Sequence, residues 1–180
     1  MRRTEEKFGM ILFRNLAGVL AIVWMCVIFA FSAQTKEESS GVSESFSYRM
    51  VSSTRFFFHL DMSDERVREI AGAIEGLVRK AAHMTEYGIL SVLLFIFIGQ
   101  WELGFLLRGA LSFGATAVYA ASDEIHQLFV PGRAGRFSDV CIDSAGALLG
   151  IIVFVLLVKL VRHFRARKQR RLQTGAAKQN

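Results

Sequence analysis

Four apolar segments, each about as long as a bilayer is thick, constrain this chain more than any other feature. They run over residues 15–33, 81–99, 103–121 and 140–158, and a helix needs roughly 20 apolar residues to cross the hydrocarbon core. The composition agrees, because 52% of the 180 residues are hydrophobic and the mean hydropathy is +0.35, more apolar than an ordinary soluble domain. We therefore predict an all-α, polytopic membrane protein built as a four-transmembrane-helix bundle.

Basic residues cluster at the two ends of the chain. The formal net charge is +6, yet residues 159–180 hold eight Lys and Arg and no acid, so the remainder is slightly acidic. Because Lys and Arg flank membrane spans on the cytoplasmic side, we predict a multi-pass cell-membrane protein with both termini cytoplasmic. The predicted parts are a cytoplasmic N-terminus (1–14), a membrane domain (15–158) and a basic tail (159–180). We expect the tail to meet anionic inner-leaflet lipid, not nucleic acid.

The segment between the first two spans, residues 34–78, is predicted to lie outside the cell. Its first part, "TKEESSGVSESFS", is rich in Ser and Glu and is expected to be solvated and mobile. In its second part Ser63 is an expected helix cap, followed by apolar residues at helical spacing: Val67, Ile70, Ile74 and Leu77. This pattern predicts an amphipathic helix on the outer membrane surface. The pattern fits a cover over a binding site and a simple connector equally well.

Ionisable side chains collect at the span ends that this topology places outside. On the second span one stripe of about 120° holds Arg79, Lys80, His83, Glu86 and Tyr87. The third span ends with Tyr119, Ser122, Asp123, His126 and Gln127, with Glu124 to one side, and the fourth begins with Asp139 and Asp143. Ionisable residues inside a membrane face the bundle interior and mark functional sites. We therefore predict an outward-facing polar pocket with Asp143 as its floor.

Several residues near this pocket have a second interpretation. Asp139 is also a natural cap for the fourth helix. Gly146 and Gly150 form G-x-x-x-G, which is typical of close helix packing in membranes. Arg133 and Arg136 follow a predicted Pro-Gly turn, and they are either solvated loop charges or donors to an anionic group over the pocket.

Three motifs in this order resemble the VanZ-like family of bacterial membrane proteins: "RKAAHMTEYGIL", "SDEIHQLFVPGRAGRFSD" and "DSAGALLG". The resemblance covers about residues 24–151 and implies a small helical membrane protein. The namesake of the family is associated with low-level resistance to teicoplanin, a lipid-tailed glycopeptide. The family brings no agreed reaction, so the resemblance marks positions without assigning chemical roles. The matching positions are Lys80, His83, Glu86, Tyr87, Asp123, Glu124, His126, Gln127, Arg133, Asp139, Gly146 and Gly150.

The first predicted function is binding at the outward-facing pocket. The ligand would be a lipid headgroup, a lipid-linked envelope component or a lipid-tailed glycopeptide, with a contribution to cell-envelope processes or teicoplanin resistance. Cationic side chains suit phosphate and carboxylate groups. The predicted headgroup-binding residues are Lys80, Tyr87, Glu124, Gln127, Arg133, Arg136, Asp139 and Asp143.

The alternative is a membrane-embedded hydrolase or transferase acting on a lipid or lipid-linked headgroup. Its predicted catalytic residues are His126, Asp123, His83 and Glu86, with a histidine as general base and a carboxylate that orients it. The sequence has no H-E-x-x-H, nucleophile elbow or phosphate-binding glycine loop, so we predict no cofactor and no metal. Four spans without a repeat argue against a monomeric transporter.

Overall fold

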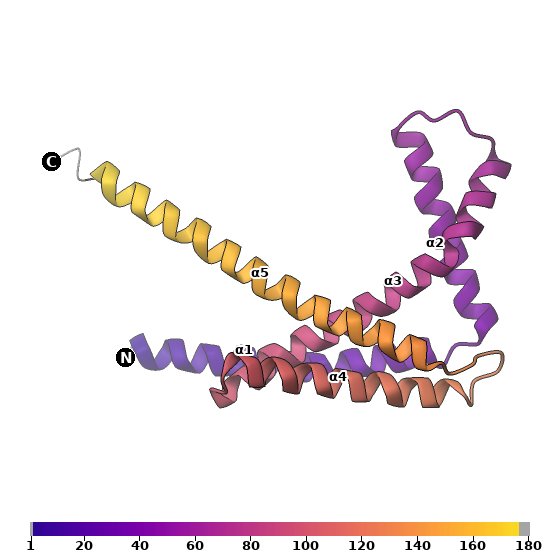
Figure 1. Ribbon diagram of the computed structural model, residues 1–180. Coiled ribbons are helices and arrows are strands. Elements are labelled where there is room, and N and C mark those ends of the chain that lie inside the picture. The colour runs from indigo at the N-terminus through magenta and orange to yellow at the C-terminus, as the bar shows by residue number, and fades with distance from the viewer. Residues whose placement is uncertain (1, 177–180) are drawn as a thin grey trace.

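The computed structural model describes residues 2–176, and helices joined by short loops make up this part of the protein (Figure 1). The elements are α1 (Arg2–Ser32), α2 (Lys36–Phe57), α3 (Asp64–Ile98), η1 (Gly99–Trp101), α4 (Phe105–Gln127) and α5 (Phe137–Ala176). No strand occurs within these residues, which confirms the predicted all-α class. The side chains of residues 1–4, 6–7 and 170–180 lie outside the described part. These include Arg2, Arg3 and Lys7, which are basic residues of the predicted cytoplasmic N-terminus.

Three helices are long and apolar enough to cross a membrane. The segments run over Phe8–Ser32, Asp64–Trp101 and Phe137–Gln169, on α1, α3 and α5. The segment predicted as a further span forms α4, whose apolar stretch is limited by Arg108 near its start and by Asp123 and Glu124 at its end. The four-helix transmembrane bundle therefore stays a prediction, whereas the multi-pass helical character is established.

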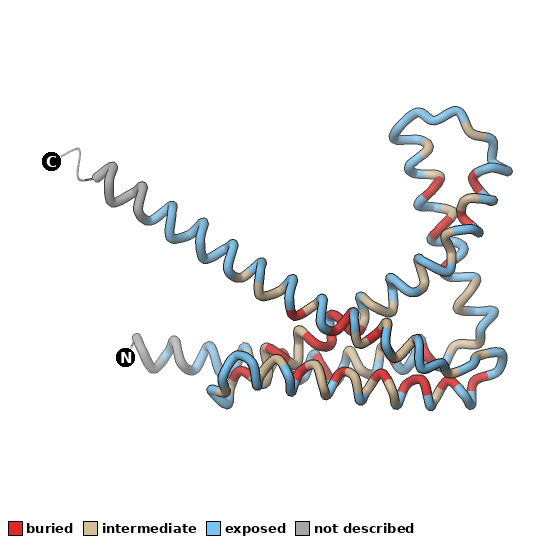
Figure 2. The backbone as a smooth tube through the Cα atoms, viewed as in Figure 1, coloured by how far each residue is buried: buried red, intermediate tan, exposed pale blue. Residues whose placement is uncertain are grey.

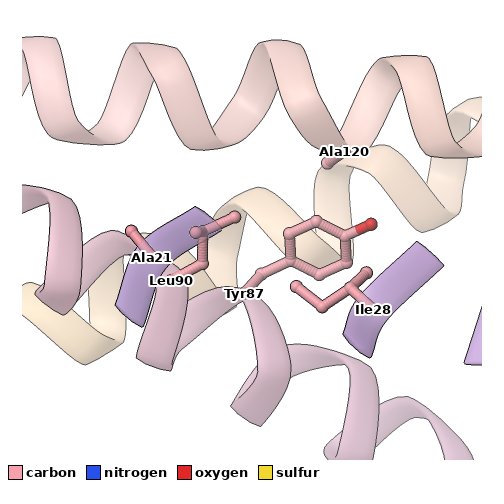
Figure 3. Packing of buried hydrophobic residues seen from close by; sticks show 5 residues of the cluster. All are labelled: Ala21, Ile28, Tyr87, Leu90 and Ala120. Atoms are coloured by element: carbon pink, nitrogen blue, oxygen red, sulfur yellow. The ribbon is translucent and has the colours of Figure 1, made fainter. Parts of the chain in front are cut away.

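The helix α3 is the centre of the fold, since it packs against α1, α2, α4 and α5. Five buried residues form the main core: Ala21, Ile28, Tyr87, Leu90 and Ala120 (Figure 3). Figure 2 shows buried residues where these helices meet, and residues 159–169 of α5 are exposed. The helix α5 extends well beyond the predicted span 140–158 and continues through the basic residues of the tail.

Glycines bring α3 and α5 into backbone contact. A Cβ atom on Gly150 would lie 2.5 Å from the carbonyl oxygen of Gly88 and 2.7 Å from its Cα atom. A Cβ atom on Gly146 would overlap the backbone of Met84. The G-x-x-x-G residues of α5 thus lie at the crossing with α3, where only glycine leaves room for the neighbouring backbone.

Two helical segments form an arm that projects from the rest of the molecule (Figure 1). The arm consists of α2 and residues 64–75 of α3, which pack around Val51, Val67 and Ala71. Ser63 caps α3 by accepting a hydrogen bond from the amide of Arg66 at 3.3 Å, which confirms the predicted helix start.

The prediction of a mobile Ser/Glu-rich segment after α1 was wrong, because this segment forms α2. A capping box starts the helix: the Glu38 amide donates to the Thr35 hydroxyl at 3.3 Å, and the Thr35 amide donates to the Glu38 carboxylate at 2.8 Å. Small residues then let α2 approach α3, with Ser43 and Ser47 buried between them. Tertiary packing supplies the stability that the polar composition of α2 does not.

The predicted amphipathic helix exists, but it is neither separate nor free. It is the first part of α3, which continues without interruption into the second predicted span. Its apolar residues Val67, Ile70 and Ile74 pack in the arm around Val51, so this face is covered by protein. Of the four predicted apolar positions, only Leu77 is strongly exposed.

Candidate functional site

A polar pocket of about 360 Å³ lies at the end of the helices opposite the two chain ends. Eight of the predicted site residues line it: Lys80, His83, Glu124, Gln127, Arg133, Arg136, Asp139 and Asp143. Arg79 of the predicted polar stripe also lines it. The structure adds Lys36 and Ser39 of α2, Gly76 of α3, Gly132 and Ala134 of the α4–α5 loop, and Ile142 of α5. Four helices and one loop therefore contribute to a single cavity.

Three cations on the pocket wall are exposed and come from three different segments. They are Lys36 of α2, Lys80 of α3 and Arg136 of the loop. None of them forms an ion pair within the described part of the chain. Arg79 differs, because its guanidinium pairs with Glu75 one turn earlier. The three unpaired cations remain available to an anionic ligand.

Carboxylates lie deeper in the pocket than these cations. Asp143 is only 3% exposed and belongs to α5. Glu124, at the end of α4, is also buried, and its Oε2 atom accepts a hydrogen bond from the Arg136 amide at 2.8 Å. Asp139 lies in the first turn of α5, where the helix dipole favours negative charge. The pocket therefore offers positive groups at its rim and negative groups inside.

The loop between α4 and α5 folds back over the pocket through a tight turn. Gly132 has a φ of 75° and the amide of Arg133 donates to the carbonyl of Val130 at 3.1 Å, as expected for a Pro-Gly turn. The Arg133 guanidinium donates to the carbonyl of Gln34 at 2.8 Å and to that of Phe31 at 3.2 Å. Burial lowers the pKa of Arg133, but a guanidinium stays charged at neutral pH. Arg133 thus ties the loop to the end of α1.

A buried hydrogen-bonded group lies behind the wall of the pocket. The Tyr87 hydroxyl donates to Asp123 Oδ2 at 3.0 Å, and the Gln127 side-chain amide donates to the same oxygen at 3.2 Å. Tyr87 is fully buried and Asp123 is 4% exposed. Asp123 Oδ1 is buried without a hydrogen-bond partner. Neither Tyr87 nor Asp123 lines the cavity, so they contact a ligand only if the wall moves.

The two predicted catalytic histidines lie in different surroundings. His83 lines the pocket, and its Nδ1 atom lies 3.5 Å from Glu86 Oε2. His126 instead packs on Phe29 of α1, with ring centroids 4.4 Å apart, and its buried Nδ1 atom has no hydrogen-bond partner. The structure therefore places Glu86 beside His83 but outside the pocket lining, and it does not pair His126 with Asp123.

Among the side chains that the structure describes, no group of three His, Cys, Asp or Glu residues is placed to hold a metal ion. The mixture of free cations, buried carboxylates and one histidine can bind a charged headgroup or transfer protons. The pocket therefore suits recognition or acid–base chemistry on a polar ligand.

The contribution of α2 to the pocket was missed by the sequence reasoning. Lys36 and Ser39 reach the cavity because α2 begins directly beside the α4–α5 loop, where a Cβ atom on Gly132 would lie 3.2 Å from Lys36 Cβ. A signal was present in the sequence, since Thr35 and Glu38 have the spacing of a capping box. It places a helix, and with it Lys36, at the end of the first span.

These features define a multi-pass α-helical membrane protein with a polar pocket at one end of its helices. A family model described as VanZ/LLP1 matches residues 17–158, and the chain belongs to this family. The match confirms the resemblance seen in the three motifs. No curated protein and no solved structure matches the chain.

Proposed function

We propose that the pocket binds the anionic headgroup of a membrane lipid or lipid-linked envelope molecule. The observation that carries this proposal is the set of three unpaired cations, Lys36, Lys80 and Arg136, around one cavity. These three cations come from separate segments of the chain and share one opening. Phosphate and carboxylate groups are the ligands that such cations bind best.

The proposed topology has four spans, formed by α1, α3, α4 and α5, with both termini cytoplasmic and the pocket facing outward. Figure 1 supports this topology, because the start of α1 and the end of α5 lie on the same side of the molecule. An even number of crossings brings both ends of a chain to one side of a membrane, which supports α4 as a span beside α1, α3 and α5. Basic residues after the last span favour the cytoplasm for that side.

The size of the pocket favours a headgroup over a whole glycopeptide. Its volume of about 360 Å³ is near the lower end of the roughly 300–1,000 Å³ typical of small-ligand sites. In this proposal the acyl chains of the ligand remain in the bilayer beside the helices. A contribution to cell-envelope processes or teicoplanin resistance would then follow from binding an envelope lipid.

The test compares lipid retention by the wild-type protein and by three single variants, Lys36→Ala, Lys80→Ala and Arg136→Ala. The matched control is Arg68→Ala, which removes an exposed cation of α3 that does not line the pocket. After purification in nanodiscs that contain phosphatidylglycerol and phosphatidylcholine, bound lipid is counted by native mass spectrometry. We expect each pocket variant to retain about tenfold less phosphatidylglycerol, as for loss of one charge-assisted hydrogen bond. Equal retention by all four variants would contradict the proposal.

A second candidate is a hydrolase or transferase that acts on the same headgroup. The observation that favours it is the place of His83, which lines the pocket with Glu86 3.5 Å from its Nδ1 atom. His83 would act as general base and Glu86 would orient it. His83→Gln would then abolish turnover of envelope lipids, measured by mass spectrometry, while retention of intact lipid persists. Intact lipid after incubation with wild-type protein would leave binding as the function.

A further inference from the structure

An apolar stripe on α2 has no protein partner in the described chain. It consists of Val42, Phe46, Met50 and Phe57, which are 64%, 59%, 42% and 76% exposed. At about 100° per residue these four positions fall within an arc of roughly 80°. An exposed apolar surface of this kind marks contact with a membrane or with another molecule.

The other two faces of α2 differ from this stripe, since one packs against α3 and the other is polar. Ser43, Ser47 and Val51 face α3 and are buried in the arm. The polar face, which includes Glu37 and Glu44, is exposed. The helix is thus divided into a protein-packed face, an apolar exposed face and a polar exposed face. A helix whose free side faces only water carries polar residues there, so the apolar exposed face indicates a contact with something other than water.

The tip of the arm enlarges the apolar stripe. Phe56, Phe57 and Phe58 follow one another and are 81%, 76% and 64% exposed. The tip is held in place, because the Arg55 guanidinium bonds to the Asp64 carboxylate at 2.7 Å and to the Met62 carbonyl at 3.0 Å. Three consecutive exposed phenylalanines are therefore presented by an ordered turn.

The position of α2 indicates that lipid covers the apolar stripe. The helix begins at Lys36, four residues after the membrane helix α1 ends at Ser32, so its start lies at the bilayer surface. Figure 1 shows α2 running across the direction of α1 instead of continuing it. Exposed Phe29 and Phe31 at the end of α1 also bring lipid-facing residues close to the start of α2.

We propose that α2 lies on the membrane surface with its apolar stripe and phenylalanine tip in the interfacial lipid. The arm then anchors the pocket end of α3 to the lipid surface. This role belongs to α2 and not to the first part of α3, whose apolar face is buried in the arm. It is independent of the headgroup proposal, because none of the stripe residues lines the pocket.

The test measures how deep single positions of α2 lie in a bilayer. In a background with Cys26→Ser and Cys141→Ser, a nitroxide label is attached to a cysteine introduced at Phe46, at Phe57 or, as control, at Glu44 on the polar face. All three positions are exposed, so the labels leave the contact between α2 and α3 intact. The full-length protein is placed in phosphatidylcholine–phosphatidylglycerol nanodiscs, and collisions with oxygen and with a water-soluble nickel chelate are recorded by electron paramagnetic resonance.

We expect the ratio of oxygen to nickel collisions to be several-fold higher at Phe46 and Phe57 than at Glu44. Ratios at Phe46 and Phe57 equal to that at Glu44 would place the stripe in water and overturn the proposal. Exclusion of both reagents, together with broadening between labels on two chains, would overturn it as well by showing a second copy on the stripe.

Discussion

Replacement of Gly150 by alanine tests the crossing of α3 and α5, the two helices that carry His83 and Asp143 of the pocket lining. His83 and Met84 are neighbours on α3, and Asp143 precedes Gly146 by one turn on α5. A displacement at the crossing therefore moves one pocket wall relative to the other.

The structure sets the size of the expected effect. The new Cβ atom would lie 2.5 Å from the Gly88 carbonyl oxygen, whereas ordinary contacts begin at 3.4 Å. The neighbouring atoms are backbone, so the helices must separate by roughly 0.9 Å, and such overpacking typically destabilises by about 1–3 kcal/mol. The higher helix propensity of alanine offsets this by about 1 kcal/mol at most.

A second glycine-to-alanine variant serves as a matched control, because it gains the same helix propensity without the steric overlap. Gly114 lies in α4, and a Cβ atom there would meet nothing within 4 Å. We expect Gly150→Ala to unfold more easily than Gly114→Ala by about 1–3 kcal/mol, measured by reversible denaturation in dodecyl sulfate in mixed micelles. Equal free energies of unfolding for these two variants would refute the reasoning, since they would show that α5 accommodates the methyl group without displacement.

Three further variants test other contacts. Tyr87→Phe removes the donor 3.0 Å from the Asp123 carboxylate and should lower the free energy of unfolding by about 1–3 kcal/mol in the same denaturation assay; an unchanged value would show that the hydroxyl contributes nothing. Arg133→Ala removes the two bonds to carbonyls at the end of α1 and should speed hydrogen exchange in residues 128–136, with Arg136→Ala as the comparison that leaves these bonds in place. For Glu38, hydrogen bonds from Thr35 lower the pKa below its ordinary value of 4.5, so its stabilisation of α2 is full above that value and is lost as the pH falls through the lowered pKa. Hydrogen exchange at the start of α2, corrected for intrinsic rates, should show this loss in the wild type and not in Glu38→Gln, and identical pH profiles would contradict the assignment.

The membrane-type fold and most of the pocket lining were predictable because two properties of the sequence determine them, the length of its apolar runs and the helical repeat. Long apolar runs require helices in lipid, and the helical repeat fixes which side chains share a face. Lys80 and His83 on one helix and Asp143 on another therefore line one cavity. The ends of the helices were less predictable, since α3 begins 17 residues before the predicted span and α5 continues beyond Val158.

Contacts between helices far apart in sequence were not predictable from one chain. The orientation of His126 depends on Phe29 of α1, which covers it, and no periodicity on α4 reveals that neighbour. The helix α2 was not predicted because its composition is polar. Its packing face contains small polar residues such as Ser43 and Ser47, which are also typical of a solvated linker. Local sequence shows which residues share a face of a helix, but not which element meets that face.

The uninterrupted course of α3 has a mechanical consequence. From Asp64 to Ile98 a single hydrogen-bonded rod passes through the arm, the pocket wall and the glycine crossing. A sharp kink in such a helix interrupts backbone hydrogen bonds, whereas tilting the whole helix about the crossing at Gly88 interrupts none. Lys80 and His83 lie between the arm and this crossing on the same helix. If α3 tilts as one rigid helix about the crossing, a displacement of the arm also displaces Lys80 and His83 in the pocket wall, by a smaller distance.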